Sequence, residues 1–135
     1  MVVLSPEQQA FVREPRIAVL ATVDPGGGPH AAPMWYALDG SQIVMVTRRG
    51  SQKHRNLQRL AKATVVIDRR SRPYFALMIA CRVSFADHQV DLVRSRVAAR
   101  YLSEPELSTY LDSRRGGDAV VIQLEPTDIA VYGSP

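Results

Sequence analysis

A basic segment in the first half of the chain carries the clearest chemical signal in the sequence. No acidic residue occurs between Asp39 and Asp68. That interval instead holds a histidine and six cations: His54, Arg48, Arg49, Lys53, Arg55, Arg59 and Lys62. Because the formal net charge of all 135 residues is only +4, these cations are concentrated rather than spread. A localised cationic stretch of this kind indicates an anion site.

The order of residues in this segment is typical of a phosphate site at a helix start. Thr47 ends an apolar run, Gly50 permits a sharp turn, and Ser51 is a preferred N-cap residue. A helix N-terminus is already partly positive, so each added cation there costs roughly 0.3–1 kcal/mol. A bound anion offsets that cost, and free backbone N–H groups with Arg and Lys donors form a phosphate cradle. A solvated basic surface is the alternative interpretation.

A second segment, His30-Ala31-Ala32-Pro33-Met34-Trp35-Tyr36, combines small residues, a proline and two aromatic rings. Small side chains and a Pro break would allow a flat ring to approach the backbone, and Trp35 and Tyr36 offer apolar area. Taken alone, the pattern is weak evidence, because a tryptophan in such a position commonly belongs to the core.

The usual catalytic constellations are missing. The sequence has no Gly-x-Ser-x-Gly elbow, His-Glu-x-x-His, Cys-x-x-Cys or P-loop. The three histidines show no metal-ligand spacing, so no metal site is expected. Cys81 has apolar neighbours, which indicates a buried structural thiol. No catalytic residue can be named, and an enzyme built this way would depend on a bound cofactor for its reactivity.

Hydrophobic periodicity predicts a mainly β chain with a few helices. Six strands are expected, at Ile17–Val23, His30–Leu38, Gln42–Thr47, Thr64–Asp68, Tyr74–Phe85 and Ala119–Leu124. Four helices are expected, from Ser5 to about Arg13, from Ser51 to about Leu60, over Asp87–Leu102, and over Pro105–Leu111 with a Ser103/Glu106 capping box. Hairpin-joined strands of this kind favour a Greek-key or split barrel over a doubly wound sheet.

Two details of these strands predict their surroundings. Pro33 cannot donate a ladder hydrogen bond, so its strand is expected to be bulged or at a sheet edge. Phe75–Cys81 is apolar without interruption, which predicts burial on both faces, the second face being covered by a partner subunit.

Composition limits the class of protein. A chain of 135 residues with 46% hydrophobic and 22% charged residues is expected to form one soluble domain over residues 1–135. No apolar run approaches the roughly 20 residues that span a bilayer, and Met1–Arg16 does not have the pattern of a signal peptide. The single cysteine favours a reducing cytoplasm. Nucleic-acid binding is disfavoured, because the basic segment lacks interleaved aromatic residues.

The combined order of these segments resembles the pyridoxamine-phosphate-oxidase-like split β-barrels, particularly the F420-dependent flavin/deazaflavin oxidoreductases of class B. Arg13–Asp24 is similar to that family's first strand and turn, and Gly28–Tyr36 to its second strand. Arg48–Leu57 is similar to its phosphate-binding turn and helix, and Val131–Gly133 to its closing segment. The resemblance covers nearly the whole chain.

The resemblance implies a six-stranded split barrel that forms a homodimer with cofactor sites at the interface. It assigns the cofactor phosphate to one group of side chains: Thr47, Arg48, Arg49, Ser51, Lys53 and Asn56. It assigns the ring to Ala32, Pro33, Met34 and Trp35, with Tyr74 and Tyr132 approaching, and Arg72 and Arg100 as further candidates for an anionic tail. Two departures, Ala80-Cys81 for a Glu-Gly pair and Leu60-Ala61 for an acidic-Pro pair, leave the phosphate turn intact.

The leading functional hypothesis is therefore an F420-dependent reductase acting on a small electron-poor acceptor, with quinones, tetrapyrroles and nitro compounds all open. Six cations suit the phosphate and glutamate tail of F420 better than the single phosphate of FMN. An FMN-dependent oxidoreductase or oxidase is the alternative on the same fold. A cofactor carrier without turnover is the alternative from another class.

Overall fold

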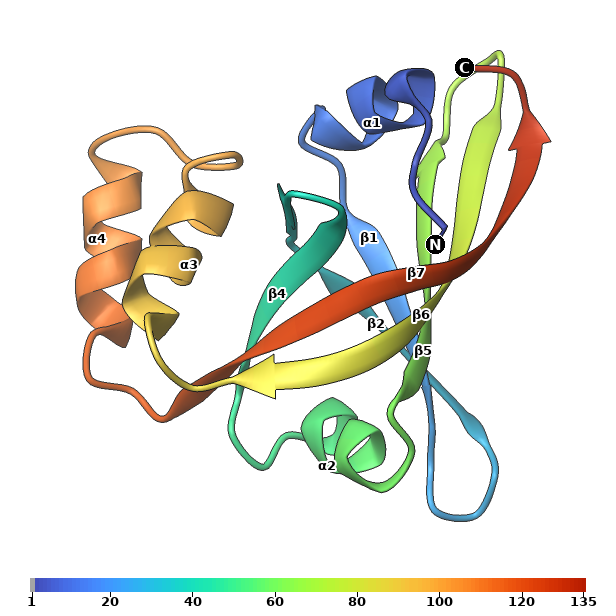
Figure 1. Ribbon diagram of the computed structural model, residues 1–135. Helices are drawn as coiled ribbons and strands as arrows, with labels where there is room; N and C mark the ends of the chain where they lie inside the picture. The colour runs from blue at the N-terminus through green and yellow to red at the C-terminus, as the bar shows by residue number, and fades with distance from the viewer. Residues whose placement is uncertain (1) are drawn as a thin grey trace.

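Antiparallel strands dominate the computed structural model, which describes residues 2–135 (Figure 1). Seven strands pair into one sheet in the order β2-β1-β5-β6-β7-β4-β3. Their bounds are β1 Ala18–Val23, β2 Pro29–Met34, β3 Ala37–Asp39, β4 Gln42–Arg48, β5 Lys62–Arg69, β6 Phe75–Ala86 and β7 Ala119–Gly133. The helices are α1 Pro6–Arg13, α2 Gln52–Arg59, α3 Val90–Ala98 and α4 Glu106–Arg114.

The two edge strands of this sheet, β2 and β3, are consecutive in the chain. Only Trp35 and Tyr36 separate them, so the sheet has to curl until its edges approach. β3 is short and pairs with β4 only from Gln42 to Val44. The rest of β4 pairs with β7 alone, which leaves a split in the barrel on the side of β2. The result is a split barrel rather than a closed one.

The expected strand His30–Leu38 is wrong as a single element, and this accounts for seven strands instead of six. The chain leaves the β1 ladder after Met34, and the backbone of Tyr36 bonds to side chains instead of a strand. Its N–H donates to the Tyr101 hydroxyl at 3.3 Å, and its carbonyl accepts from Arg100. The edge position predicted from Pro33 is confirmed, since β2 pairs only with β1.

The core lies on the concave face of the sheet. Strand β6 alternates, with Leu77 and Ile79 fully buried inside and Ala76, Met78 and Ala80 partly exposed outside. The single chain therefore buries one face of this run, and cover of the other face by a partner subunit stays a prediction.

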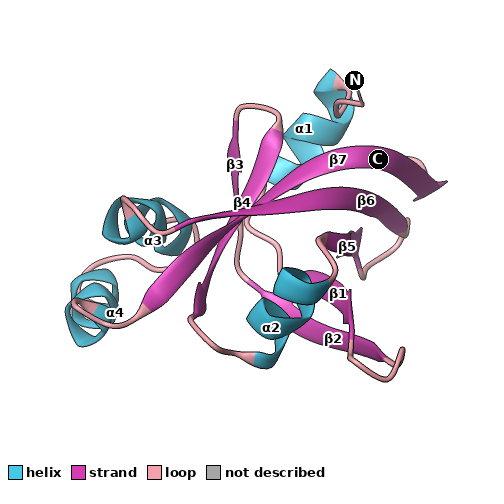
Figure 2. Cartoon of the chain, turned by 60° about the horizontal axis from the view of Figure 1, so that its bottom comes forward, coloured by secondary structure: helices cyan, strands magenta, loops and turns pink. Residues whose placement is uncertain are grey.

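Helices close the barrel and cover one flank (Figures 1 and 2). Helix α1 contributes Phe11 and Val12 to the main core, and α2 contributes Leu57. Helix α3 packs Val97 against Val44 and Val121, on the outer face of β4 and β7, as a second apolar cluster. The helical pair α3–α4 is thus held beside β4, next to the split.

The helix predictions are mostly confirmed, with changes at the ends. Ser5 and Gln8 form the expected reciprocal capping box. Helix α3 is shorter than the predicted Asp87–Leu102. The predicted Ser103/Glu106 box is wrong, because the carboxylate that accepts the Ser108 N–H, at 2.7 Å, belongs to Glu104. Strand β7 continues well past Leu124, since it pairs with β6 as far as Gly133.

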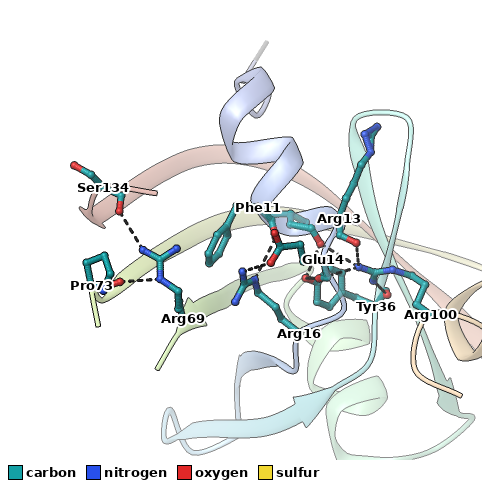
Figure 3. Close-up of polar contacts among 10 residues, drawn as sticks. Phe11, Arg13, Glu14, Arg16, Tyr36, Arg69, Pro73, Arg100 and Ser134 are labelled. Carbon is teal, nitrogen blue, oxygen red and sulfur yellow. Dashed lines mark hydrogen bonds and ion pairs between the residues drawn. The ribbon is translucent and has the colours of Figure 1, made fainter. Parts of the chain in front are cut away.

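Arg100 joins three parts of the chain that are distant in sequence (Figure 3). One guanidinium nitrogen donates to the carbonyls of Val12, Arg13 and Glu14 at 3.0, 2.9 and 3.2 Å. The other donates to the carbonyl of Tyr36, whose hydroxyl in turn donates to Val12 at 2.7 Å. The C-terminal end of α1, the crossover between β2 and β3 and the segment after α3 are thereby tied together. These contacts occupy the guanidinium that the resemblance offered to an anionic tail.

We expect Arg100→Met to lower the free energy of unfolding by roughly 1.5–3 kcal/mol, because several carbonyls lose a charged donor. Urea unfolding followed by circular dichroism measures this. Arg13→Met is the matched control, since the Arg13 side chain makes no hydrogen bond or ion pair within residues 2–135. Equal stability of the two variants would contradict the role assigned to Arg100.

Candidate functional site

The turn between β4 and α2 is built by its own side chains. The Thr47 and Ser51 hydroxyls lie 3.0 Å apart, and Ser51 Oγ accepts from the His54 N–H at 3.3 Å as the N-cap of α2. Gly50 has φ 81°, in the left-handed region, and its N–H donates to His54 Nδ1 at 2.9 Å. The turn is therefore fixed in shape, and it holds Thr47 and Ser51 together.

Arg48 and Lys53 are the cations of this turn that lack partners. Neither side chain makes an ion pair or hydrogen bond within residues 2–135. Burial lowers the pKa of Lys53, and the neighbouring Arg48 charge lowers that pKa further. Two cations that repel each other and have no ion-pair partner within residues 2–135 favour an anion between them. This fits a phosphate group.

Arg49 and Asn56 are engaged within the chain. Arg49 Nε donates to Asp118 Oδ1 at 2.9 Å. Asn56 is fully buried, and its amide donates to Thr22 at 3.0 Å and Asp24 at 2.9 Å while accepting from Gln52 at 2.8 Å. Their direct contact with a cofactor stays a prediction, whereas Asn56 holds α2 against the end of β1 and Arg49 holds the turn against the start of β7.

A groove runs along the outer side of β4, between the split and the α3–α4 pair. It consists of two adjoining hollows of about 340 Å³ each, which share Val46, Arg94, Tyr110 and Arg114. One hollow reaches Pro33, Met34 and Trp35, and the other reaches Thr47, Arg48 and Asp118. The structure thus brings parts of both predicted segments, the ring segment and the phosphate turn, to one groove.

Trp35 forms the aromatic end of this groove. Its ring stacks on Tyr101 with centroids 4.8 Å apart and an 8° interplanar angle, and lies 5.3 Å from the Tyr110 ring. Ala32 pairs with Leu20 on β1 and does not line either hollow. Of the ring segment, therefore, Pro33, Met34 and Trp35 reach the groove.

Tyr74 and Tyr132 do not reach the groove in a single chain. Both are exposed, and Tyr132 pairs with Ala76 at the start of β6. The groove end of β7 is Ala119, at the opposite end of that ladder. These two tyrosines can join the site only from another subunit.

Sequence reasoning missed Arg94, Tyr110 and Arg114, which line both hollows. A signal for Arg94 exists in the sequence, because the arginine stands on the apolar stripe of its helix, four residues after Val90 and three before Val97. The other two lie on α4, and their position depends on how the helical pair packs.

Among residues 2–135 there is no group of three or more His, Cys, Asp or Glu side chains that could hold a metal ion. No helix in that range is long and apolar enough to cross a membrane.

The curled sheet, its split and the cationic turn before α2 together define a split β-barrel protein with a groove beside the barrel. The family model of pyridoxamine 5'-phosphate oxidase matches residues 4–133. The chain therefore belongs to this family, as the sequence resemblance predicted.

Solved structures share this fold. A conserved hypothetical protein from Mycobacterium tuberculosis has a TM-score of 0.79 at 23% identity, over 98% of this chain and 86% of its own. An F420 reductase has a TM-score of 0.77 at 24% identity, over 95% and 98%. A heme storage protein from Vibrio cholerae has a TM-score of 0.70 at 17% identity, over 98% and 95%. At such identities the likeness shows the fold alone. No curated protein matches the sequence.

The buried His54 is expected to make the turn between β4 and α2 sensitive to pH. Burial lowers the pKa of His54 below its ordinary value of 6.5, and the Arg49 charge lowers it further, against an opposing effect of Asp118. The unfolded chain therefore takes up the proton first. We expect stability to be complete above pH 6.5 and to fall as the pH drops below that value.

Thermal unfolding of wild type and His54→Gln between pH 8 and 5 tests this expectation. The wild-type melting temperature should fall more steeply than that of the variant, whereas the exposed His88→Gln should follow wild type. Parallel profiles for wild type and His54→Gln would show that His54 is not the titrating group.

Proposed function

We propose that the protein is an F420-dependent reductase that works as a homodimer and transfers a hydride to an electron-poor organic acceptor, such as a quinone or a tetrapyrrole. The observation that carries the proposal is the groove itself. At one end lies the Arg48 cation beside Lys53, which has no partner within residues 2–135, and at the other end lies the ring of Trp35.

Arg48, Lys53 and the Thr47–Ser51 turn would hold the cofactor phosphate. Arg48 lines the groove at the end of β4, and Lys53 is in the first turn of α2, where the backbone N–H groups face outward. Arg49 would act indirectly, because its bond to Asp118 fixes the turn against β7. Pro33, Met34 and Trp35 would line the ring.

When bound, a reduced deazaflavin supplies the hydride, and the chain contributes position and charge. F420 is favoured over FMN because six cations lie between Arg48 and Lys62, which suits a ligand with more than one anionic group. An FMN-dependent oxidoreductase or oxidase is the alternative. Cys81, buried with a pKa raised by burial to about 12, is a poor candidate for chemistry and agrees with a reducing cytoplasm as the proposed location.

A cofactor-binding protein without turnover is the second candidate. This candidate is supported by the heme storage protein that shares this fold. Consumption of reduced F420, followed by absorbance with menadione as acceptor, decides between the two. A carrier would bind the coenzyme without oxidising it.

We expect Lys53→Ala to weaken F420 binding by roughly 1–3 kcal/mol, about a 5- to 150-fold rise in Kd, through the loss of a charge-assisted contact. Fluorescence titration of the purified protein with F420 and with FMN measures this, and wild type should bind F420 more tightly. Lys62→Ala, an exposed position at the start of β5, is the matched loss of charge outside the turn. An unchanged Kd in Lys53→Ala would contradict the assignment of the phosphate site to this turn.

The outer face of the sheet supports the proposed homodimer. Val19, Val66, Met78 and Ala130 form one row across β1, β5, β6 and β7, in register. The next row contains Ala21, Thr64, Ala80 and Asp128, so the one charge in these two rows lies on β7 and the positions on β1, β5 and β6 carry none. A partner subunit on this face would complete the burial that the apolar β6 sequence predicts, and it could bring Tyr74 and Tyr132 to the neighbouring groove.

We expect light scattering to give a dimer for wild type and a monomer for Met78→Glu, because a buried unpaired carboxylate opposes association. Ser41→Glu adds the same charge in the exposed β3–β4 turn and should stay dimeric. A monomeric wild type at micromolar concentration would refute the interface.

A further inference from the structure

Arg94 is a buried cation in the middle of the groove, between the phosphate turn and Trp35. It is 8% exposed and lines both hollows. Its only partner within residues 2–135 is Asp91, whose Oδ1 lies 2.9 Å from Nη1. Because a guanidinium has five N–H donors, most of its hydrogen-bonding capacity is unused.

The free nitrogens of Arg94 are accessible from the groove. Among residues 2–135, the one buried side-chain nitrogen or oxygen that lacks a partner belongs to His30, so Nε and Nη2 of Arg94 are not sealed inside the protein. The Asp91 side chain is 69% exposed against 9% for Arg94, so water screens that ion pair. Burying a cation with unused donors is unfavourable unless a ligand completes its contacts.

The neighbours of Arg94 indicate the shape and charge of that ligand. Tyr110 and Trp35 line the groove as aromatic walls, and their rings contact each other with centroids 5.3 Å apart at an angle of 42°. The Arg114 guanidinium lies 3.9 Å above the Tyr110 ring and has no acidic partner within residues 2–135. Aromatic walls favour a planar apolar body, and a guanidinium fork favours a carboxylate.

We propose that Arg94, flanked by Tyr110 and Arg114, is an acceptor subsite that binds the carboxylate of a planar aromatic substrate. This inference rests on the proposed function, because only a reductase would take an acceptor at this subsite. It adds a second anion-binding position to the same groove. The subsite is distinct from the phosphate turn, because Arg94 also lines the hollow that reaches Trp35, and Arg48 does not line that hollow. The acceptors are thereby narrowed to carboxylated planar molecules.

Trp35 provides a direct test, because it is the only tryptophan in the chain and lies in the groove. The probes are anthraquinone-2-carboxylate and its neutral counterpart, 2-(hydroxymethyl)anthraquinone. Each is titrated into the full-length protein without cofactor, and quenching of tryptophan fluorescence, corrected for absorbance, gives Kd. The readout does not depend on turnover or on F420.

We expect the carboxylate probe to bind wild type about tenfold more tightly than the neutral probe. In Arg94→Met this ratio should fall to about one, with the neutral probe unchanged, which also shows that the groove is intact. Arg94→Lys keeps the charge without the fork and should recover part of the ratio. Arg96→Met removes a cation of the same helix that does not line either hollow and should leave the ratio as in wild type.

Three results would overturn the proposal: equal affinity of the two probes for wild type, an unchanged ratio in Arg94→Met, or an Arg94→Met variant that loses FMN or F420 affinity as strongly as it loses the carboxylate probe. The last result would assign Arg94 to the cofactor. If Lys53→Ala leaves coenzyme binding unchanged while the Arg94 ratio behaves as expected, the coenzyme assignment fails and the carboxylate subsite stands.

Discussion

The short crossover at Trp35 and Tyr36 is the constraint on which the barrel depends. Two residues carry the chain from one edge of the sheet to the other, and the Tyr36 backbone is held there by Arg100 and Tyr101 instead of by a strand. The crossover curls the sheet and leaves the split between β2 and β4. It also directs the two rings to opposite sides, with Tyr36 fully buried in the core and Trp35 turned to the helical pair.

The groove follows from that split. A closed barrel would pair the remaining edge of β4 with β2, whereas here the outer side of β4 is free for α3 and α4 to cover in part. The helical pair brings Arg94 and Arg114 toward a strand that ends in Arg48. A cation with an acidic partner within the chain, such as Arg49 with Asp118, helps to fix the shape of the turn. Arg48 and Arg114, which have no acidic partner within residues 2–135, face the groove, where a ligand can meet them.

Much of this arrangement could be predicted from sequence where the cause is local. The Ser51 cap, the hairpins and the edge position of Pro33 each follow from one residue and its neighbours in the chain. The contacts of Asn56 with Thr22 and of Arg49 with Asp118 span 34 and 69 residues, and no spacing rule encodes them. The break at Tyr36 was missed for the same reason, since its bonding partner Tyr101 is 65 residues away. Arg94 could have been found as a charge on an apolar helix face, but its groove depends on α4.

The proposed cofactor site depends on the proposed dimer, because two of its predicted residues lie far from the groove of their own chain. Tyr74 and Tyr132 are exposed at the end of the β6–β7 ladder that is remote from the groove. The apolar row through Met78 lies between those tyrosines and the rest of the outer face. If two copies pair through this row, each presents its tyrosines beyond its own sheet, while the groove of each is open along the split. A second subunit would then supply further aromatic cover for a ring whose phosphate the turn would hold.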